Sequence, residues 1–180
     1  MRILKERTVA LIIDMQERIF PVIHENGKLA SRVVVLIEGL KAVGIPLFVT
    51  EQYVKGLGTT IPQVAAVLGD IKRIEKSSFS CCDEPRFMEA LTLTTKENVI
   101  IAGIESHVCV LQTVIDLKRN AYQPVVVEDC ISSRSPEDKA IALQRMLQEG
   151  AIITTTESIL FELLRYSGGD AFRAVSKLVK

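Results

Sequence analysis

The residue whose type and position most favour chemistry is Cys109. It follows a run of apolar residues at 99–102 and falls in the first turn of the helical segment that comes next. A thiol there faces the positive end of the helix dipole, which lowers its pKa and favours the nucleophilic thiolate. Free backbone N–H groups in the same turn can hold a developing oxyanion. The alternative interpretation is a buried cysteine that acts as a small hydrophobic residue.

A nucleophilic thiol needs a base, and the chain has only two histidines, His24 and His107. His107 lies two residues before Cys109, so on a helix its side chain points elsewhere, and a Cys–His pair is not expected. Asp14 follows the apolar run at 9–13, and Lys76 follows the run at 70–74. A partly buried carboxylate near a cation can act as the base. The alternatives are that Asp14 caps the turn after its strand and that Lys76 is solvated.

The elements that must position these residues are short strands that alternate with helices. Val- and Ile-rich runs occur at residues 9–13, 46–49, 70–74, 99–102, 125–127 and 151–153. Most are continuous apolar stretches, as expected of strands that helices cover on both faces. Apolar residues at helical spacing predict helices at 28–43, 84–93, 107–119, 136–148, 156–164 and 170–178. We therefore expect an α/β fold, a three-layer, Rossmann-like α/β/α arrangement with a six-stranded, mostly parallel sheet and helices on both faces.

Length and composition predict a single domain spanning residues 1–180. Hydrophobic residues make up 48% of the chain and charged residues 24%, which permits a sizeable core and excludes intrinsic disorder. Lys+Arg and Asp+Glu both number 22, so there is no basic excess for nucleic acid or an anionic membrane. No apolar run approaches the ~20 residues of a membrane-spanning helix, and the first residues lack a secretory-signal pattern. We expect a cytoplasmic protein with reduced thiols, a small-molecule substrate, and neither a nucleic-acid nor a membrane partner.

Three motifs, each at a predicted strand end, resemble a known family. They are LIIDMQ at 11–16, Lys76 together with Phe79, and GIESHVCV at 103–110. Over nearly its whole length the chain resembles the isochorismatase-like cysteine hydrolases, which include nicotinamidases and related amidases. The segments TEQY at 50–53 and DCISSR at 129–134 are similar to the branch of isochorismatase-domain proteins.

The resemblance implies a catalytic triad, with Asp14 as general base, Lys76 as the cation that polarises the site and Cys109 as nucleophile. It also implies a cis peptide between Ile104 and Glu105, which would aim the N–H of Glu105, together with that of Cys109, at the oxyanion. Family members assemble into dimers and larger rings, so a homo-oligomer is expected. The candidates for the substrate pocket are Gln16, Phe20, Gln52, Phe79 and His107.

Two departures from the family pattern narrow the expected reaction. Metal-binding nicotinamidases carry Asp-x-His after the second strand, whereas residues 51–53 here are Glu-Gln-Tyr, so neither a zinc or iron site nor any other cofactor is expected. The isochorismatases that hydrolyse a vinyl ether lack the cysteine, so Cys109 favours hydrolysis of an amide or related C–N bond through a thioester. The alternative is a catalytically silent scaffold or oligomer subunit.

A dinucleotide-binding module is a further alternative for alternating strands and helices. Residues 14–18 contain no G-x-G-x-x-G, which disfavours it. The loops at 52–62 and 79–82 are expected to form the pocket walls, the first as a mobile loop over the site. Cys81, Cys82 and Cys130 are not needed by the mechanism; they are interpreted as reduced thiols that either pack in the interior or approach the pocket.

Overall fold

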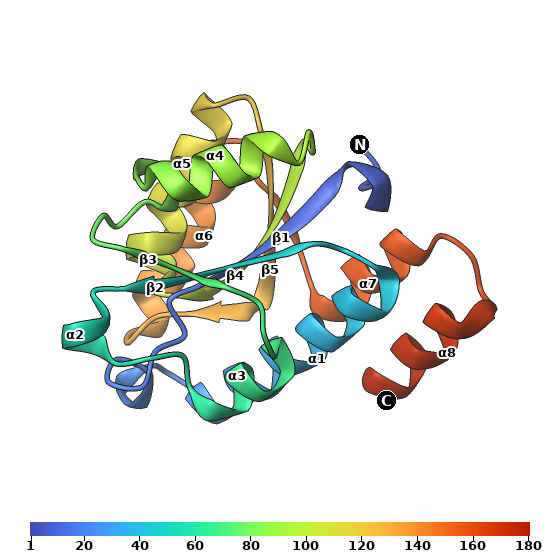
Figure 1. Ribbon diagram of the computed structural model, residues 1–180, viewed down its shortest axis with the longest axis horizontal. Helices are drawn as coiled ribbons and strands as arrows, with labels where there is room; N and C mark the ends of the chain where they lie inside the picture. The colour runs from blue at the N-terminus through green and yellow to red at the C-terminus, as the bar shows by residue number, and fades with distance from the viewer.

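A computed structural model describes residues 1–180, and its centre is a single six-stranded sheet (Figure 1). All five strand pairings are parallel, so the α/β prediction is confirmed and the sheet is entirely, not mostly, parallel. The strand order is β3-β2-β1-β4-β5-β6. The strands are β1 (Thr8–Ile13), β2 (Leu47–Gln52), β3 (Arg73–Lys76), β4 (Asn98–Ile104), β5 (Gln123–Ser132) and β6 (Ile152–Thr154).

Helices cover both faces of this sheet. They are α1 (Asn26–Val43), α2 (Val54–Leu57), α3 (Pro62–Leu68), α4 (Pro85–Leu93), α5 (Leu111–Arg119), α6 (Pro136–Gln148), α7 (Thr156–Leu164) and α8 (Gly169–Leu178). A π-helical turn (Ser106–Val110) precedes α5, and three short 3-10 turns are Lys5–Arg7, Phe20–Val22 and Cys81–Asp83. No helix is both long and apolar enough to cross a membrane.

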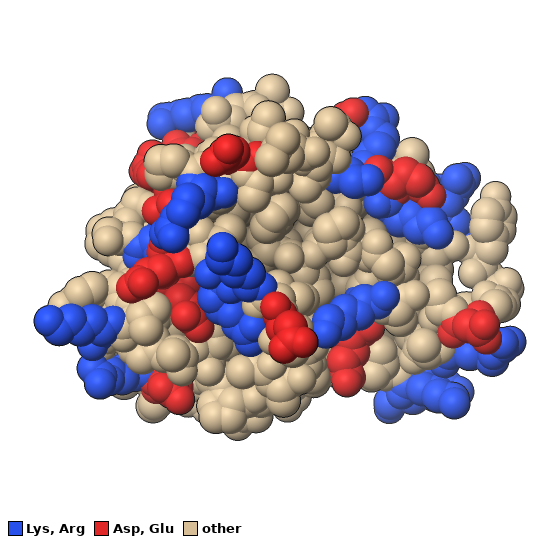
Figure 2. Space-filling model, in the orientation of Figure 1, with Lys and Arg blue, Asp and Glu red and all other residues tan.

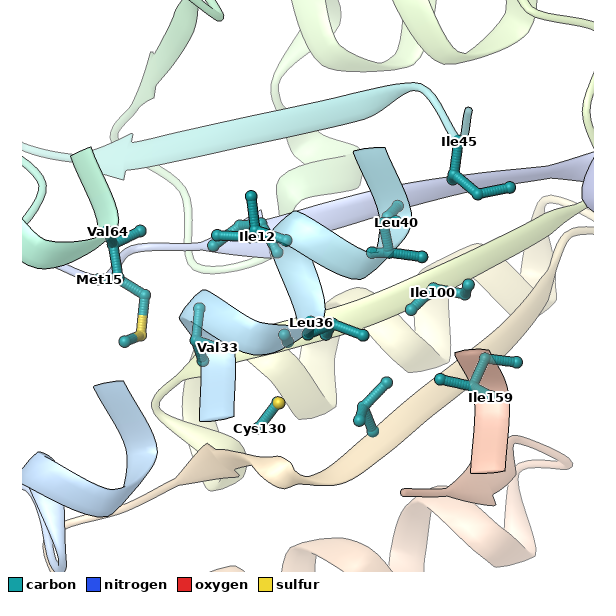
Figure 3. Close-up of a cluster of buried hydrophobic side chains, with 14 of the residues drawn as sticks. Ile12, Met15, Val33, Leu36, Leu40, Ile45, Val64, Ile100, Cys130 and Ile159 are labelled. Carbon is teal, nitrogen blue, oxygen red and sulfur yellow. The ribbon is translucent and has the colours of Figure 1, made fainter. Parts of the chain in front are cut away.

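Two apolar cores, one on each face, hold the layers together. Successive residues of a strand point to opposite faces, and β1 accordingly sends Ala10 and Ile12 into one core and Val9, Leu11 and Ile13 into the other. The first core lies between the sheet and α1, α3, α7 and α8 (Figure 3), and the second between the sheet and α4, α5 and α6. This two-sided burial explains why the strands carry continuous apolar runs. The predicted C-terminal helix is α8, which packs against α1 and α7.

The helix ends follow the signals in the sequence. The Ser135 hydroxyl accepts hydrogen bonds from the N–H groups of Glu137 and Asp138, and Pro136 is the first residue of α6. Gly44, with φ of 87°, ends α1 in the left-handed conformation that glycine adopts without strain. Both ends were predicted.

Three element predictions need correction. The third strand spans Arg73–Lys76 instead of 70–74, because its pairing with β2 begins at Val49 and Arg73. The fifth strand is longer than predicted and runs through Asp129 and Cys130 to Ser132, since pairing with β4 resumes after an irregularity between Ile101 and Gly103. Helix α3 was not predicted, because its seven residues are too few for a clear helical pattern.

The strand order also fixes where a ligand can bind. The chain runs outward in one direction from β1 through β2 to β3, and in the other from β4 through β5 to β6. In such sheets a crevice opens beyond the carboxyl ends of the strands at the point of reversal, here between β1 and β4. The loops that follow these two strands carry Asp14 and Cys109.

Candidate active site

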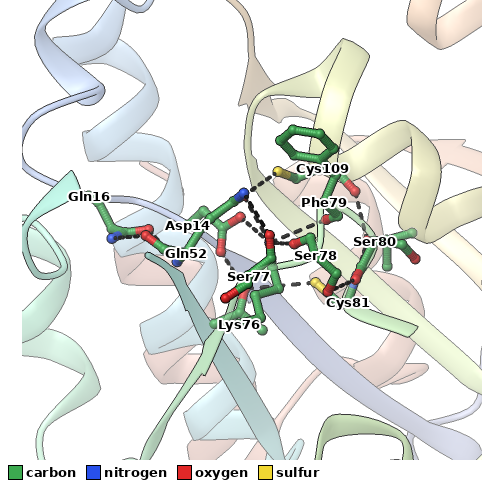
Figure 4. A network of polar contacts seen from close by, with 12 residues as sticks. Asp14, Gln16, Gln52, Lys76, Ser77, Ser78, Phe79, Ser80, Cys81 and Cys109 are labelled. Atoms are coloured by element: carbon green, nitrogen blue, oxygen red, sulfur yellow. Dashed lines mark hydrogen bonds and ion pairs between the residues drawn. The ribbon is translucent and has the colours of Figure 1, made fainter. Parts of the chain in front are cut away.

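The three residues predicted as a triad lie at one edge of the sheet (Figure 4). Asp14 directly follows β1, Lys76 is the last residue of β3, and Cys109 lies in the π-helical turn after β4. Lys76 Nζ is 2.6 Å from Asp14 Oδ2. The amide oxygen of Gln52, the last residue of β2, lies 3.2 Å from Lys76 Nζ and 3.1 Å from Cys109 Sγ. Gln52 therefore links the cation to the thiol.

The backbone around Asp14 is shaped to present its carboxylate. Asp14 has φ of 51°, a left-handed conformation that aspartate tolerates better than most residues. Its Oδ1 accepts a hydrogen bond of 2.7 Å from the hydroxyl of Thr50, which is buried on β2. On the other side, a Cβ atom at Gly103 would come within 2.1 Å of the Ile13 carbonyl oxygen. Glycine at 103 thus lets β4 approach the residue just before Asp14.

Lys76 is a buried cation. Its side chain is 0% exposed and that of Asp14 is 4% exposed, so the pair is shielded from water. Burial by itself lowers the pKa of Lys76, but the charge of Asp14 and its hydrogen bond to Lys76 favour the ammonium, and the net effect of the surroundings raises the pKa above its usual 10.5. The ammonium therefore stays charged at neutral pH. A buried pair of this kind strongly resists loss of one partner, because the other charge would be left uncompensated.

The expected lowering of the Cys109 pKa is wrong. Cys109 is 6% exposed, and burial raises the pKa of its thiol well above the usual 9.0. The charge of Asp14 adds to this rise, while that of Lys76 opposes it. Burial and the charge of Asp14 thus favour the protonated thiol of Cys109, whose ionisation a nearby base would assist.

Glu105 places a free backbone donor next to the thiol. The peptide bond between Ile104 and Glu105 is cis, as the family resemblance implies. The Glu105 carbonyl accepts hydrogen bonds from the N–H groups of Val108 and Val110, each 3.1 Å long, whereas its own N–H donates to no protein group. Such an unused donor beside a nucleophile can bind a developing oxyanion.

A cavity of about 110 Å³ adjoins these groups. Two of the predicted pocket residues, Gln52 and Phe79, line it, from the predicted loops at 52–62 and 79–82. Its lining also includes four residues that were not predicted as pocket residues: Ile19, Leu57, Ile104 and Val108. The available signals were their apolar character, the position of Ile104 and Val108 inside the third motif, and the position of Leu57 in the predicted wall loop.

Three predicted pocket residues do not line this cavity. Gln16 is fully buried and instead clamps β2: its amide oxygen accepts from Gln52 N at 2.6 Å, and its Nε2 donates to Gln52 O at 2.9 Å. Phe20 belongs to a short 3-10 turn and lines a separate cavity beside α1. The ring of His107 turns toward Ser133, with Nδ1 2.9 Å from its hydroxyl. Gln16 therefore supports the site indirectly.

The loop at 52–62, which was predicted to be mobile, forms several contacts with neighbouring segments. It contains the short helix α2, and Gln16 and Thr60 form an antiparallel bridge. The buried Glu51 carboxylate accepts hydrogen bonds from both the N–H and the hydroxyl of Thr60, at 2.8 and 2.6 Å. The Arg18 guanidinium holds the carbonyls of residues 55 and 56 at 3.2 and 2.9 Å. These contacts fix the wall that carries Leu57.

The other three cysteines lie outside the cavity lining. Cys81 is fully buried, with its sulfur 3.8 Å from the Thr50 hydroxyl, and Cys82 is half-buried. Cys130 lies within β5, in the core beneath α1, and not after the strand as predicted. All four thiols are free. No group of three or more His, Cys, Asp or Glu side chains is arranged to hold a metal ion.

Comparison with known proteins agrees with this fold and with the sequence motifs. The family pattern described as Isochorismatase domain matches residues 8–158. Isochorismatase domain-containing protein 2A of Mus musculus is 33% identical over 180 residues, which cover 99% of this chain and 85% of the mouse protein.

Two solved structures superpose closely. The MAR1 ribonuclease of Caenorhabditis elegans is 37% identical with a TM-score of 0.93, over 99% of this chain and 92% of that one. The YcaC gene product of Escherichia coli, described as an octameric hydrolase of unknown specificity, is 25% identical with a TM-score of 0.92, over 98% and 88%. The fold is thus that of the isochorismatase-like hydrolases. The chain belongs to the isochorismatase family.

Proposed function

We propose that the protein is a cysteine-dependent hydrolase that cleaves an amide or related C–N bond of a small molecule. The observation that carries this proposal is the meeting of a neutral thiol, a carboxylate and a buried cation at one cavity. Cys109 and Asp14 both line that cavity, and Lys76 pairs with Asp14 at 2.6 Å. A carboxylate beside an uncharged thiol is the arrangement that general-base activation of a nucleophile requires.

In the proposed first half-reaction, the Asp14 carboxylate takes the thiol proton as Cys109 Sγ bonds to the substrate carbonyl carbon. The carbonyl π electrons move to oxygen, where the N–H groups of Glu105 and Cys109 stabilise the negative charge. When the tetrahedral intermediate collapses, the C–N bond breaks and the nitrogen leaves with the proton from Asp14. A thioester on Cys109 remains.

In the second half-reaction, Asp14 accepts a proton from water as the water oxygen attacks the thioester carbonyl. The C–S bond then breaks, the carboxylic acid leaves, and the proton on Asp14 returns to the Cys109 sulfur. Lys76 keeps the carboxylate in place and stabilises the negative charge on sulfur. Since burial keeps the thiol protonated at rest, proton transfer is expected to accompany attack on the carbonyl.

Gln52 is proposed to hold the thiol between turnovers. Its amide oxygen accepts the Cys109 S–H, and Gln16 fixes the Gln52 backbone from both sides. Activation then needs only a rotation of the S–H bond from Gln52 toward Asp14.

An amide screen tests the proposal. Wild-type protein is incubated with simple carboxamides and ureido compounds, and release of ammonia or amine is measured. Mass spectrometry of quenched samples detects a thioester on Cys109. We expect Cys109→Ala to lower turnover about 10⁴-fold or more and to abolish the thioester.

Cys130→Ala is the matched control, because it also removes a buried thiol yet leaves the cavity intact. It should retain turnover close to wild type. Equal activity in wild type and the Cys109→Ala variant would overturn the proposal. A protein that neither forms a thioester nor hydrolyses any compound would favour the alternative of a catalytically silent scaffold or oligomer subunit.

The name of the C. elegans relative raises RNA hydrolysis as a second candidate. The formal net charge of this chain is +0, and acidic and basic side chains are interspersed on the face shown in Figure 2. Such a face offers no single-sign surface for a polyphosphate backbone. Labelled single-stranded RNA in the same assay separates the two activities: RNA cleavage that needs Cys109, without amide hydrolysis, would favour the nuclease.

Assembly and location complete the proposal. The octameric relative from E. coli supports a homo-oligomer, which light scattering after gel filtration would test. A mass equal to a single chain at micromolar concentration would contradict it. Location in the cytoplasm and organisation as one domain over residues 1–180 stay predictions from the sequence.

A further inference from the structure

The lining of the cavity beside Cys109 contains acidic residues but no basic ones. Its lining includes two carboxylate residues, Asp14 and Glu105, and no lysine, arginine or histidine. The other polar lining residue is Gln52. The apolar part of the wall consists of Ile19, Leu57, Phe79, Ile104, Val108 and the Cys109 side chain. A ligand that enters therefore meets apolar groups and negative charge.

The nearby cation is not available to a ligand. Lys76 Nζ lies within 2.6 to 3.2 Å of four oxygens, those of Asp14, Gln52, Ser78 and Phe79. An ammonium has three N–H donors, so none is left over. The Lys76 side chain is also 0% exposed. A substrate carboxylate consequently finds no free donor there.

Glu105 is a buried carboxylate at this wall. Its side chain is 7% exposed, and Arg134 Nε donates to its Oε1 at 3.0 Å. The Arg134 side chain is 60% exposed and does not line the cavity. The cation that pairs with Glu105 therefore lies outside the cavity lining. One carboxylate oxygen of Glu105 has no protein partner.

We infer that the substrate is a small amide whose acyl group is uncharged and apolar, and that the Glu105 side chain is a specificity-determining residue that rejects anionic acyl groups. The inference rests on the proposed hydrolase function. It adds a preference for uncharged over anionic acyl groups, which we call the charge rule. An anionic acyl group would lose its hydration without gaining a cation, and it would approach two carboxylates. An apolar acyl group of matching size loses little water and contacts the six apolar wall residues.

A pair of alkylating reagents tests the charge rule without turnover. Iodoacetamide and iodoacetate are alike in size, and each forms an S–C bond as iodide leaves, but only iodoacetate is anionic. The two rates at Cys109 are measured at pH 9 by mass spectrometry of the labelled peptide. The ratio of the amide rate to the acetate rate in folded protein is compared with the ratio for the same cysteine in denatured protein.

We expect the ratio of the amide rate to the acetate rate to be about tenfold or more higher in folded than in denatured protein, because the carboxylates at the cavity repel the anionic reagent. Glu105→Gln preserves the shape and the backbone N–H and should reduce that excess severalfold. Glu128→Gln is the control, because Glu128 is also paired with a cation, at 2.6 Å from Lys139, but lines another cavity. It should leave the ratio unchanged. Equal ratios in folded and denatured protein would overturn the inference.

Measurement of amide hydrolysis then distinguishes the hydrolase proposal from the charge rule. Butyramide and succinamate share a four-carbon acyl chain, and only succinamate carries a carboxylate. We expect kcat/KM to favour butyramide by about tenfold or more in wild type and by less in Glu105→Gln. Cys109-dependent preference for succinamate would overturn the charge rule and leave the hydrolase standing. A high alkylation ratio without hydrolysis of any amide would overturn the hydrolase and leave the charge rule standing.

Discussion

Two places in the molecule hold the same kinds of side chain: a cysteine, an aspartate, a threonine and a cation. The first, which we call the active-site cluster, consists of Cys109, Asp14, Thr50 and Lys76; the second, the β5 cluster, consists of Cys130, Asp129, Thr156 and Arg32. In both, an aspartate oxygen accepts a hydrogen bond from the threonine hydroxyl, at 2.7 Å in the first and 3.0 Å in the second. In both, the thiol is buried.

The two clusters differ in how the cation is held. Lys76 and Asp14 are 2.6 Å apart with side chains 0% and 4% exposed, whereas Arg32 and Asp129 are 3.9 Å apart with side chains 45% and 22% exposed. Asp129 also accepts the N–H of Thr156 at 2.8 Å and so caps the start of α7. The β5 cluster is therefore a helix cap above a core cysteine.

Burial of the thiol does not distinguish the proposed reactive site from the β5 cluster. Burial is the main cause that raises the pKa of both Cys109 and Cys130. The first distinguishing feature is that Cys109 lines a cavity, whereas the cavity that Asp129 lines does not include Cys130. The second is a buried cation that pairs with the nearby carboxylate. A reactive cysteine in this fold is better recognised by its neighbours than by its own ionisation.

The largest difference between the two clusters is expected in catalysis, when the charge of each aspartate is removed. Asp14→Asn removes the proposed base and should lower kcat/KM for an amide about 10³-fold or more. Asp129→Asn keeps an oxygen that can still accept from Thr156 and should leave kcat/KM within about twofold of wild type. Steady-state kinetics with the best amide of the screen measure both, with circular dichroism as a check of folding. Similar losses in the two variants would contradict the assignment of the base.

Removing the cation of each cluster should change the free energy of unfolding by different amounts. Lys76→Met leaves the Asp14 carboxylate buried and unpaired, so the free energy of unfolding should fall by about 3 to 5 kcal/mol. Arg32→Met breaks a largely exposed pair and should cost about 1 kcal/mol or less. Urea denaturation followed by circular dichroism measures the two changes. The double variant Lys76→Met with Asp14→Asn should recover part of the loss, and its failure to do so would argue against an uncompensated charge as the cause.

Much of the fold could be predicted because it depends on local pattern. Continuous apolar runs mark β1 and β4, and Ser135 with Pro136 marks the start of α6. The positions of Asp14 and Cys109 at one edge follow from those strands being parallel neighbours. The sequence motifs added Lys76, whose strand has a weak pattern.

What could not be predicted depends on contacts between distant segments. The direction of the Cys109 pKa shift is set by burial under loops that no local pattern describes. Gln16 and His107 lie within the motifs, yet their side chains bond to Gln52 and Ser133 and do not line the cavity. Thr50, which holds Asp14, would have required knowledge of the register between β1 and β2. Proximity in sequence to a motif is thus a poor guide to side-chain direction.

The smallest expected effect concerns the raised thiol pKa, which the two clusters share. Burial raises the pKa of Cys109 and of Cys130 above the usual 9.0. Above that pH the unfolded chain loses these thiol protons while the folded protein keeps them, so the free energy of unfolding falls as pH rises, by about 1.4 kcal/mol per pH unit for each thiol. The pH range of this fall begins near pH 9 and ends only above the raised pKa values of the folded protein.

Cys109→Ala and Cys130→Ala should therefore each reduce the slope between pH 9 and 10 by about the same amount, although only the first should affect the proposed catalysis. Urea denaturation at intervals of half a pH unit measures the slope. The interval ends below the usual pKa of 10.5 for Lys76, so loss of that charge contributes little. Cys81, whose pKa burial raises to about 11, adds the same background to wild type and both variants. A slope reduced by the Cys130 change alone would mean that Cys109 ionises in the folded protein, in which case the proposed base has already taken its proton at rest.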